Sequence, residues 1–156
     1  MQVDPVSNQM QTWLREAWTD GLWAASWSKS IDGLTAEQAA WLPQHNGRRH
    51  SIWQHVLHMI FWRDNCLRMV STVTLGIRPT EQEVATSNFP TLTDTSEAAW
   101  AATKQRFEES QKRIIAAFAD PCVEDKRRLA FIIPHDCYHF GQINMIRGML
   151  NLPAIE

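Results

Sequence analysis

The sequence has little cysteine, and what it has does not form a recognisable framework. Its 156 residues include three cysteines, Cys66, Cys122 and Cys137, and no two of them form a CxxC pair. An odd number of widely separated cysteines does not predict a set of disulfide bonds. We therefore expect reduced thiols, as in a cytoplasmic protein.

Long apolar runs and a strong charge of one sign are also missing. The sequence contains no stretch of about 18 apolar residues, so it predicts no membrane-spanning helix. The opening residues, MQVDPVSNQMQTW, lack the basic start and apolar stretch of a secretory signal. The formal net charge is −2, which argues against nucleic-acid binding through a basic surface. We expect neither a membrane nor a nucleic acid as a partner.

Signals for β-strands are absent as well. No stretch alternates apolar and polar residues for long, and no Asn-Gly or Asp-Gly turn joins two such stretches. Apolar residues make up 44% of the chain and charged residues 21%, which is typical of an ordinary globular protein. The length suits one domain with one core, covering residues 1–156.

Apolar residues at helical spacing predict four long helices. The first follows Asp4-Pro5 and runs to about residue 30, with Gly21 weakening it without ending it. The others cover about residues 52–75, 95–119 and 127–150, and the third carries one apolar stripe of Trp100, Phe107, Ile114 and Phe118. Pro134 interrupts the last one, either by kinking it or by beginning a new helix at its own position.

Three stretches, residues 35–38, 51–54 and 94–97, match the capping box that begins a helix. The first of them predicts a short helix that ends before Pro43. Residues 76–93 show no period, which predicts a long loop of the functional or mobile kind. Together these elements predict an all-α protein: a four-helix bundle with one short extra helix and a long loop between the second and third helices. Five tryptophans fit the core faces of these helices: Trp13, Trp27, Trp53, Trp62 and Trp100.

The stretch IPHDCYHFGQINMIRGML carries the clearest chemical signal. It places His135 and His139 four residues apart, so both imidazoles lie on one helix face and can bind one metal ion. A third ligand can come from HSIWQHVLHMIFW, where His55 and His58 are three residues apart. The spacing does not choose between them. The remaining histidines, His45 and His50, lie in or beside a polar loop, where solvation is their expected role.

The residues around this motif do not identify a catalytic group. Asp136 stands where a HExxH protease has glutamate, and it points about 100° away from the preceding histidine. Glu81 and Glu83 lie in the long loop and read as solvated charges. Gln142 is three residues after His139, where it either holds a ligand by hydrogen bond or packs as a buried amide. Two further groups, the Cys137 thiol and Arg147, read as an inert buried thiol and an ordinary surface arginine.

The stretches SIWQHVLHMIFW and IPHDCYHFGQINMIRGML together resemble the DinB-like superfamily, also called DinB/YfiT. Its members are four-helix-bundle metalloproteins with one histidine late in the first motif and an HxxxHxGQ pattern in the last helix. Carried over position by position, the resemblance implies that His58, His135 and His139 are the metal ligands. His55 is then a neighbour of the site.

A three-histidine site leaves open positions on the metal, which is typical of catalytic sites. The ligand set favours zinc or nickel and also suits iron or manganese. The resemblance implies a thiol-dependent transferase that acts on a small molecule, with a low-molecular-weight thiol as partner. The ligand set also allows hydrolysis. The alternative is a non-catalytic metal-binding or stress-related module. The tryptophan count and long helices favour a homodimer.

Overall fold

The computed structural model describes residues 4–44, 49–74 and 76–155. Within these ranges the chain is all-helical, as predicted, and its β pairing is limited to an isolated bridge between Ser71 and Val123. The helices are α1 (Pro5–Thr19), α2 (Trp27–Ile31), α3 (Ala36–Ala40), α4 (Ile52–Val70), α5 (Glu81–Ser87), α6 (Glu97–Ala117), α7 (Lys126–Ala130) and α8 (Ile132–Met149).

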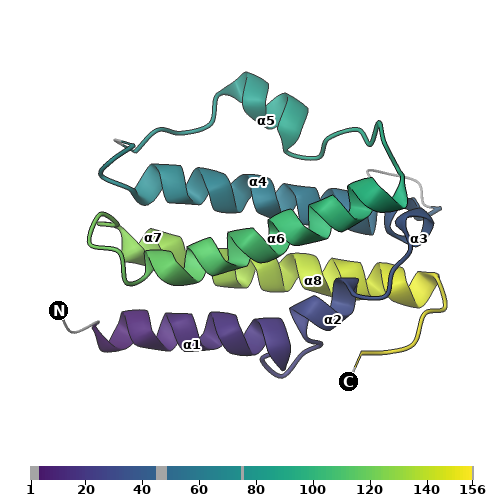
Figure 1. Cartoon of the computed structure of the whole chain (residues 1–156), viewed down its shortest axis with the longest axis horizontal. Coiled ribbons are helices and arrows are strands. Elements are labelled where there is room, and N and C mark those ends of the chain that lie inside the picture. Colours follow the sequence, from purple (N-terminus) through teal and green to yellow (C-terminus); the bar gives the residue numbers. More distant parts are fainter. Residues whose placement is uncertain (1–3, 45–48, 75, 156) are drawn as a thin grey trace.

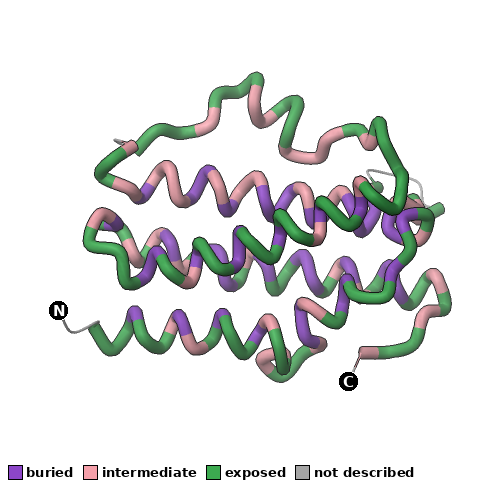
Figure 2. Tube along the Cα trace, in the orientation of Figure 1, coloured by how far each residue is buried: buried purple, intermediate pink, exposed green. Residues whose placement is uncertain are grey.

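The four long helices, α1, α4, α6 and α8, run side by side along the length of the molecule (Figure 1). Helix α4 packs against both α6 and α8, and α1 packs against α6. The short helix α5 lies outside α4, on the side away from α8 (Figure 1). Buried residues line the inward sides of the long helices (Figure 2), so one core lies between them.

The apolar stripe predicted for the third long helix is the centre of this core. Trp100, Phe107, Ile114 and Phe118 are each at most 1% exposed. They recur at intervals of seven and four residues, which places them on one face of α6 and its C-cap residue, Phe118. Of the five tryptophans predicted to be in the core, Trp27, Trp53 and Trp100 are buried, Trp62 is partly buried and Trp13 is 40% exposed.

The first long helix is shorter than predicted. Helix α1 ends at Thr19, and Gly21 follows with a φ of +75°. A Cβ at Gly21 would lie 1.9 Å from the carbonyl oxygen of Ala24. Only glycine fits this tight turn. The chain resumes as α2 after Ser26, whose hydroxyl accepts the N–H of Lys29. Gly21 therefore ends the helix, and the prediction of a continuous helix was wrong.

Two of the three capping boxes form as predicted. Thr35 exchanges both hydrogen bonds with Gln38 at the start of α3, and Ser51 does so with Gln54 at the start of α4. The third prediction was displaced by two residues, because Ser96 caps α6 and Asp94 instead accepts the Ser96 N–H at 2.9 Å.

The predicted loop between the second and third long helices contains a helix. Helix α5 has no buried residue, so no apolar period revealed it. Its start does carry a capping box: the Thr80 hydroxyl accepts the Glu83 N–H at 3.1 Å, and the Glu83 carboxylate accepts the Thr80 N–H at 2.7 Å. This Thr-x-x-Glu pattern was the available signal.

The break in the last segment falls before Pro134. Helix α7 ends at Ala130 and α8 begins at Ile132. Pro134 occupies the first turn of α8, where the N–H that proline lacks would have no helical partner. The segment therefore divides into two helices, and the second begins two residues before Pro134 and not at the proline itself.

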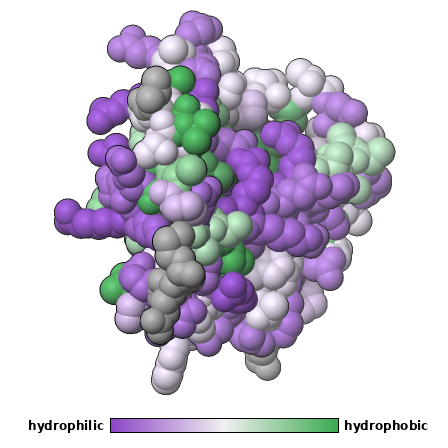
Figure 3. Space-filling view, turned by 60° about the vertical axis from the view of Figure 1, so that its left-hand side comes forward, coloured by the Kyte–Doolittle hydropathy of each residue, from purple (hydrophilic) through white to green (hydrophobic). Residues whose placement is uncertain are grey.

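Among the described residues, no helix combines the length and apolarity needed to cross a membrane. On the face shown in Figure 3, hydrophilic residues cover most of the surface and hydrophobic residues form separate patches.

Candidate metal centre

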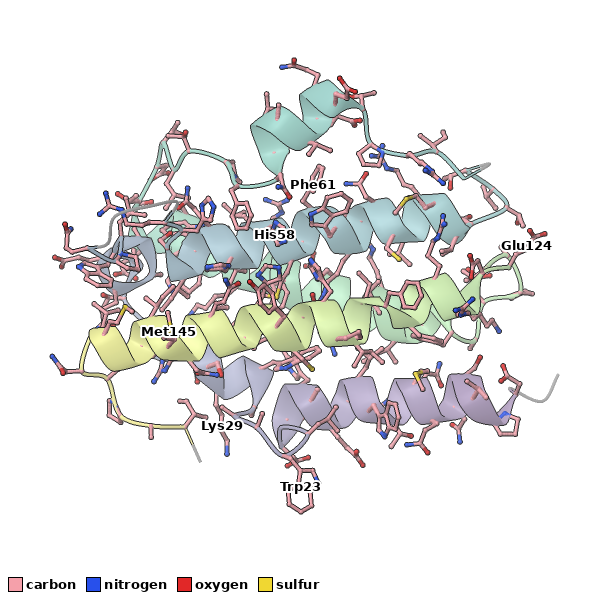
Figure 4. All side chains as sticks on the ribbon, turned by 180° about the vertical axis from the view of Figure 1, so that it is seen from behind. Trp23, Lys29, His58, Phe61, Glu124 and Met145 are labelled. Carbon is pink, nitrogen blue, oxygen red and sulfur yellow. The ribbon has the colours of Figure 1, made fainter. Side chains whose placement is uncertain are left out.

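Helices α4 and α8 bring three histidines from distant parts of the sequence together. His58 lies in the middle of α4, which runs beside α8 (Figure 4). One ring nitrogen from each of His58, His135 and His139 lies within 4.8 Å of the others. His58 and His139 are 6% exposed, and the His135 side chain is 28% exposed.

The spacing of the ring nitrogens fits a common metal ion. His58 Nε2 and His135 Nε2 are 3.2 Å apart. Two nitrogen ligands about 2.0–2.1 Å from a tetrahedral metal lie about 3.3 Å apart. Two lone pairs facing each other at this distance repel unless a cation or a proton lies between them. The donor set therefore fits a divalent cation.

The opposite nitrogen of each ring meets an oxygen acceptor. His58 Nδ1 lies 3.1 Å from the carbonyl oxygen of Asn88, His135 Nδ1 lies 2.8 Å from Asp136 Oδ1, and His139 Nδ1 lies 2.8 Å from Gln142 Oε1. An N–H at each Nδ1 satisfies these acceptors, which leaves Nε2 unprotonated on all three rings. Oxygen acceptors commonly orient metal-binding histidines in this way.

His55 lies next to the three-histidine group without belonging to it. Its Nδ1 is 3.3 Å from Nδ1 of His139, the nitrogen that also meets Gln142. Of the two α4 histidines that the spacing alone left open, the three-histidine group includes His58 and leaves out His55. His50 stacks on Phe89 with ring centroids 3.7 Å apart. His45 lies outside the described residues.

Burial keeps these imidazoles neutral. Burial and, to a lesser degree, the neighbouring histidines lower the pKa of His58 and of His139 to about 4 and that of His55 to about 3. At neutral pH these rings therefore carry free lone pairs without losing a proton first. This is the state that binds a metal ion.

The segment after α5 covers the site from outside α4. Phe89 stacks on the His58 ring at 4.1 Å between centroids. Asn88 accepts a hydrogen bond from Trp62 Nε1 at 2.7 Å, and the carbonyl of Pro90 accepts one from Gln54 Nε2 at 2.9 Å. Two α4 side chains thereby hold the segment whose backbone orients His58.

A buried ion pair lies beneath the site. Arg63 Nε is 2.7 Å from Asp136 Oδ2, and both side chains are 0% exposed. Burial lowers the pKa of Arg63, and the charge of Asp136 opposes that shift. Asp136 thus contacts both Arg63 and the ring of the preceding His135, although the helical geometry predicted that it would point away.

The other candidates from the sequence lie elsewhere. Glu81 is exposed and Glu83 caps α5, and neither belongs to the three-histidine group. Cys137 is exposed, so the prediction of a buried thiol was wrong, and it lines a cavity of about 850 Å³ with Trp13 and residues of the turn after α1. Arg147 is buried and donates to the carbonyls of Ser30 and Pro153, so its reading as a surface residue was wrong.

Arg63, Asn88 and Phe89 were not anticipated. Arg63 lies four residues after Met59 and three before Cys66, both buried, so it occupies a position on the apolar face of its helix. Asp136 likewise lies four residues before Phe140 and seven before Ile143. A single charge of each sign on two apolar faces was a signal for a buried pair. Asn88 and Phe89 carried no comparable signal.

The comparisons agree with this geometry. A family model described as the DinB superfamily matches residues 20–143, and the match includes the whole three-histidine group. The chain therefore belongs to the DinB superfamily. No curated protein and no solved structure matches it.

Proposed function

We propose that this protein is a metal-dependent enzyme in which His58, His135 and His139 hold one divalent cation inside a four-helix bundle of α1, α4, α6 and α8. The observation that carries the proposal is the set of three rings whose Nδ1 atoms meet oxygen acceptors, with one ring nitrogen of each within 4.8 Å of the others. Zinc or nickel is the favoured ion, and iron or manganese also suits the ligands.

The open side of the site supports catalysis over a purely structural role. Structural zinc sites are closed by four protein ligands. Among the described residues the group contains three ligands, and the side chain of His135 remains 28% exposed. Solvent or a small molecule therefore has a route to the point that the Nε2 atoms share.

The chemistry follows from the ligand set. A bound divalent cation supplies a Lewis acid, which lowers the pKa of water or of a thiol and polarises a carbonyl. The chain's own residues hold the site in shape: Asn88, Asp136 and Gln142 orient the three rings, and Phe89 shields His58. We propose a thiol-dependent transfer or a hydrolysis on a small molecule, with a low-molecular-weight thiol as the partner to test first.

We further propose that the protein forms a homodimer. The exposed side of α8 and its N-cap carries the large apolar side chains of Phe131, Tyr138, Met145 and Met149, which are 46–65% exposed. None of them is charged, and aromatic and methionine side chains are enriched at protein interfaces.

Metal content tests the ligand assignment. Protein purified without a histidine tag is analysed for bound elements as wild type, His58→Ala and His55→Ala. The proposal predicts about one divalent ion per chain in the wild type, loss in His58→Ala and retention in His55→Ala. A wild type that takes up no ion even after loading contradicts it.

Thiol binding separates the enzyme from a non-catalytic metal-binding module. Cobalt-loaded protein is titrated with a small thiol while its visible absorption is followed. A change in the cobalt bands shows that the open position accepts the thiol. Unchanged bands favour the module, which metal then stabilises without supporting a reaction.

A further inference from the structure

The pair of Arg63 and Asp136 is fully buried, and burying two charges costs free energy that apolar packing alone would avoid. Removing two opposite charges from water costs several kcal/mol per ion, and an apolar pair of similar volume is often at least as stable. The next residue on α4, Asp64, pairs with Arg113 of α6 at the exposed surface. A partly exposed ion pair therefore already joins α4 to α6. A buried ion pair is not needed to connect α4 to its neighbours.

The two oxygens of Asp136 are divided between two partners. Oδ2 accepts from Arg63 Nε at 2.7 Å, and Oδ1 lies 2.8 Å from His135 Nδ1. Because both contacts involve one rigid carboxylate, the orientation of the His135 ring depends on where Arg63 holds that group. Asp136 thereby connects Arg63, in the core, to His135 of the proposed metal centre.

Arg63 is itself fixed by α6. Its Nη1 donates to the hydroxyl of Ser110 at 2.9 Å, and its guanidinium lies 4.1 Å from the centroid of the Phe107 ring. Arg63 thus joins α4, α6 and α8 at one point. A guanidinium held by three directional contacts positions a carboxylate more sharply than packing alone.

His135 needs this support more than the other two histidines. Its side chain is 28% exposed, whereas His58 and His139 are 6% exposed. His58 is also stacked under Phe89. His135 is thus the ring that packing restrains least, and it is the one of the three whose Nδ1 meets a charged group.

We propose that Arg63 is a positioning residue of the metal centre, which acts through Asp136 to hold the His135 ring with Nε2 toward the other two ligands. This inference rests on the proposed metal site. It extends the site from three ligands to a chain of contacts that ends on α6. It also gives the buried charges a reason to persist.

A double-mutant cycle on metal affinity tests the inference. The variants are Arg63→Met, Asp136→Leu and the two together, and zinc affinity is measured by competition with a chelating dye. Loss of such supporting contacts typically weakens metal binding about 10–100-fold. If Arg63 acts through Asp136, the double variant loses no more affinity than Asp136→Leu alone. Additive losses overturn the inference.

Stability and affinity are separated by the choice of variants. Each single change leaves one buried charge without its partner and lowers stability, whereas the double change removes both charges. Arg63→Lys, which retains a cation next to Asp136, is expected to recover most of the lost affinity. The variant Arg113→Met breaks the exposed pair and is the matched control, with unchanged affinity expected.

A spectroscopic readout reports the His135 ring directly. In the zinc-loaded wild type, nitrogen-correlated NMR is expected to show His135 protonated at Nδ1 with a downfield proton, and this signal is lost in the double variant. If the double variant keeps both the zinc affinity and the NMR signal of the wild type, the inference is wrong and the proposed metal site stands. A wild type that binds no zinc instead refutes the proposed function.

Discussion

The interior of this protein has two unlike halves. Between α4 and α6 most buried side chains are apolar or aromatic, with Trp53 packed against Trp100 at 5.1 Å between ring centroids, and Arg63 adds a hydrogen bond to Ser110. Between α4 and α8 the interior holds histidines and the ion pair of Arg63 and Asp136. One helix, α4, contributes to both halves, and its two buried sides differ in chemistry.

The α4–α6 half mainly stabilises the fold, whereas the α4–α8 half carries the candidate metal site. Apolar burial contributes roughly 25 cal/mol for each Å² removed from water, so the α4–α6 half stabilises the structure. The α4–α8 half buries neutral imidazoles and a charged pair, which costs free energy unless each group finds a partner. We expect changes in the first half to alter stability and changes in the second to alter metal binding.

The largest effect on stability is expected from Trp100→Ala in the apolar half. Trp100 is 1% exposed, and removing a buried tryptophan side chain typically costs about 3–5 kcal/mol. Urea unfolding of the metal-free protein measures the loss. The variant should still take up one ion per chain at a temperature where it is folded. Loss of metal by the folded variant would contradict the division into two halves.

The reverse pattern is expected for His139→Ala in the polar half. A ligand that binds only the folded state stabilises it by about 2.7 kcal/mol at a concentration 100 times its dissociation constant. Adding zinc should therefore raise the melting temperature of the wild type and leave that of His139→Ala unchanged. Ile143→Val, a change one turn further along α8, is the control that should keep the full zinc-dependent shift.

The apolar half was the easier one to predict. The stripe on α6 needed only a period of 3.6 residues, and Trp100, Phe107, Ile114 and Phe118 are all buried as expected. Capping boxes gave the starts of α3 and α4 because their hydrogen bonds are local in sequence. Burial and local capping are properties that a single segment carries by itself.

The polar half was predicted in part. The i, i+4 spacing put His135 and His139 on one face, but the choice of His58 over His55 came from the resemblance. The orienting groups were harder, because the Asn88 carbonyl reaches His58 only through the fold of a segment 30 residues away. The prediction for Gly21 was wrong for a related reason. The turn brings the Ala24 carbonyl against Gly21, and the helical pattern around Gly21 does not indicate this contact.

Acid should weaken the metal-free protein through the polar half. The pKa values of His55, His58 and His139 lie at about 3 to 4 in the folded state, below the ordinary value of 6.5. As the pH falls from about 6.5 toward 4, the unfolded chain binds protons that the folded chain does not, so the free energy of unfolding decreases. Above about pH 6.5 this dependence is absent.

Thermal melts in a chelator at pH 7.5, 6 and 5 check this expectation. His55→Ala removes the histidine with the lowest pKa and should give a shallower decline over the same range. Melting temperatures that stay constant between pH 7.5 and 5 would show that the buried imidazoles do not titrate as the structure indicates.

The smallest effect is expected from a matched pair of tryptophan changes, one in each half. Trp62 Nε1 donates to Asn88 Oδ1 at 2.7 Å, and Trp53 Nε1 donates to the hydroxyl of Thr103 at 2.9 Å. Trp62→Phe and Trp53→Phe each remove one hydrogen bond, which contributes about 1 kcal/mol. Only the first bond holds a residue whose backbone carbonyl meets the ring of His58, a histidine of the candidate metal centre.

Trp62→Phe should therefore weaken zinc binding several-fold, whereas Trp53→Phe should leave it unchanged at a similar or greater loss of stability. Chemical denaturation and dye competition on both variants give the two quantities independently. Equal losses of zinc affinity would mean that stability alone governs metal binding, and the two halves of the interior would then act as one. A loss confined to Trp62→Phe would show that the two halves act separately, although both substitutions lie on one helix.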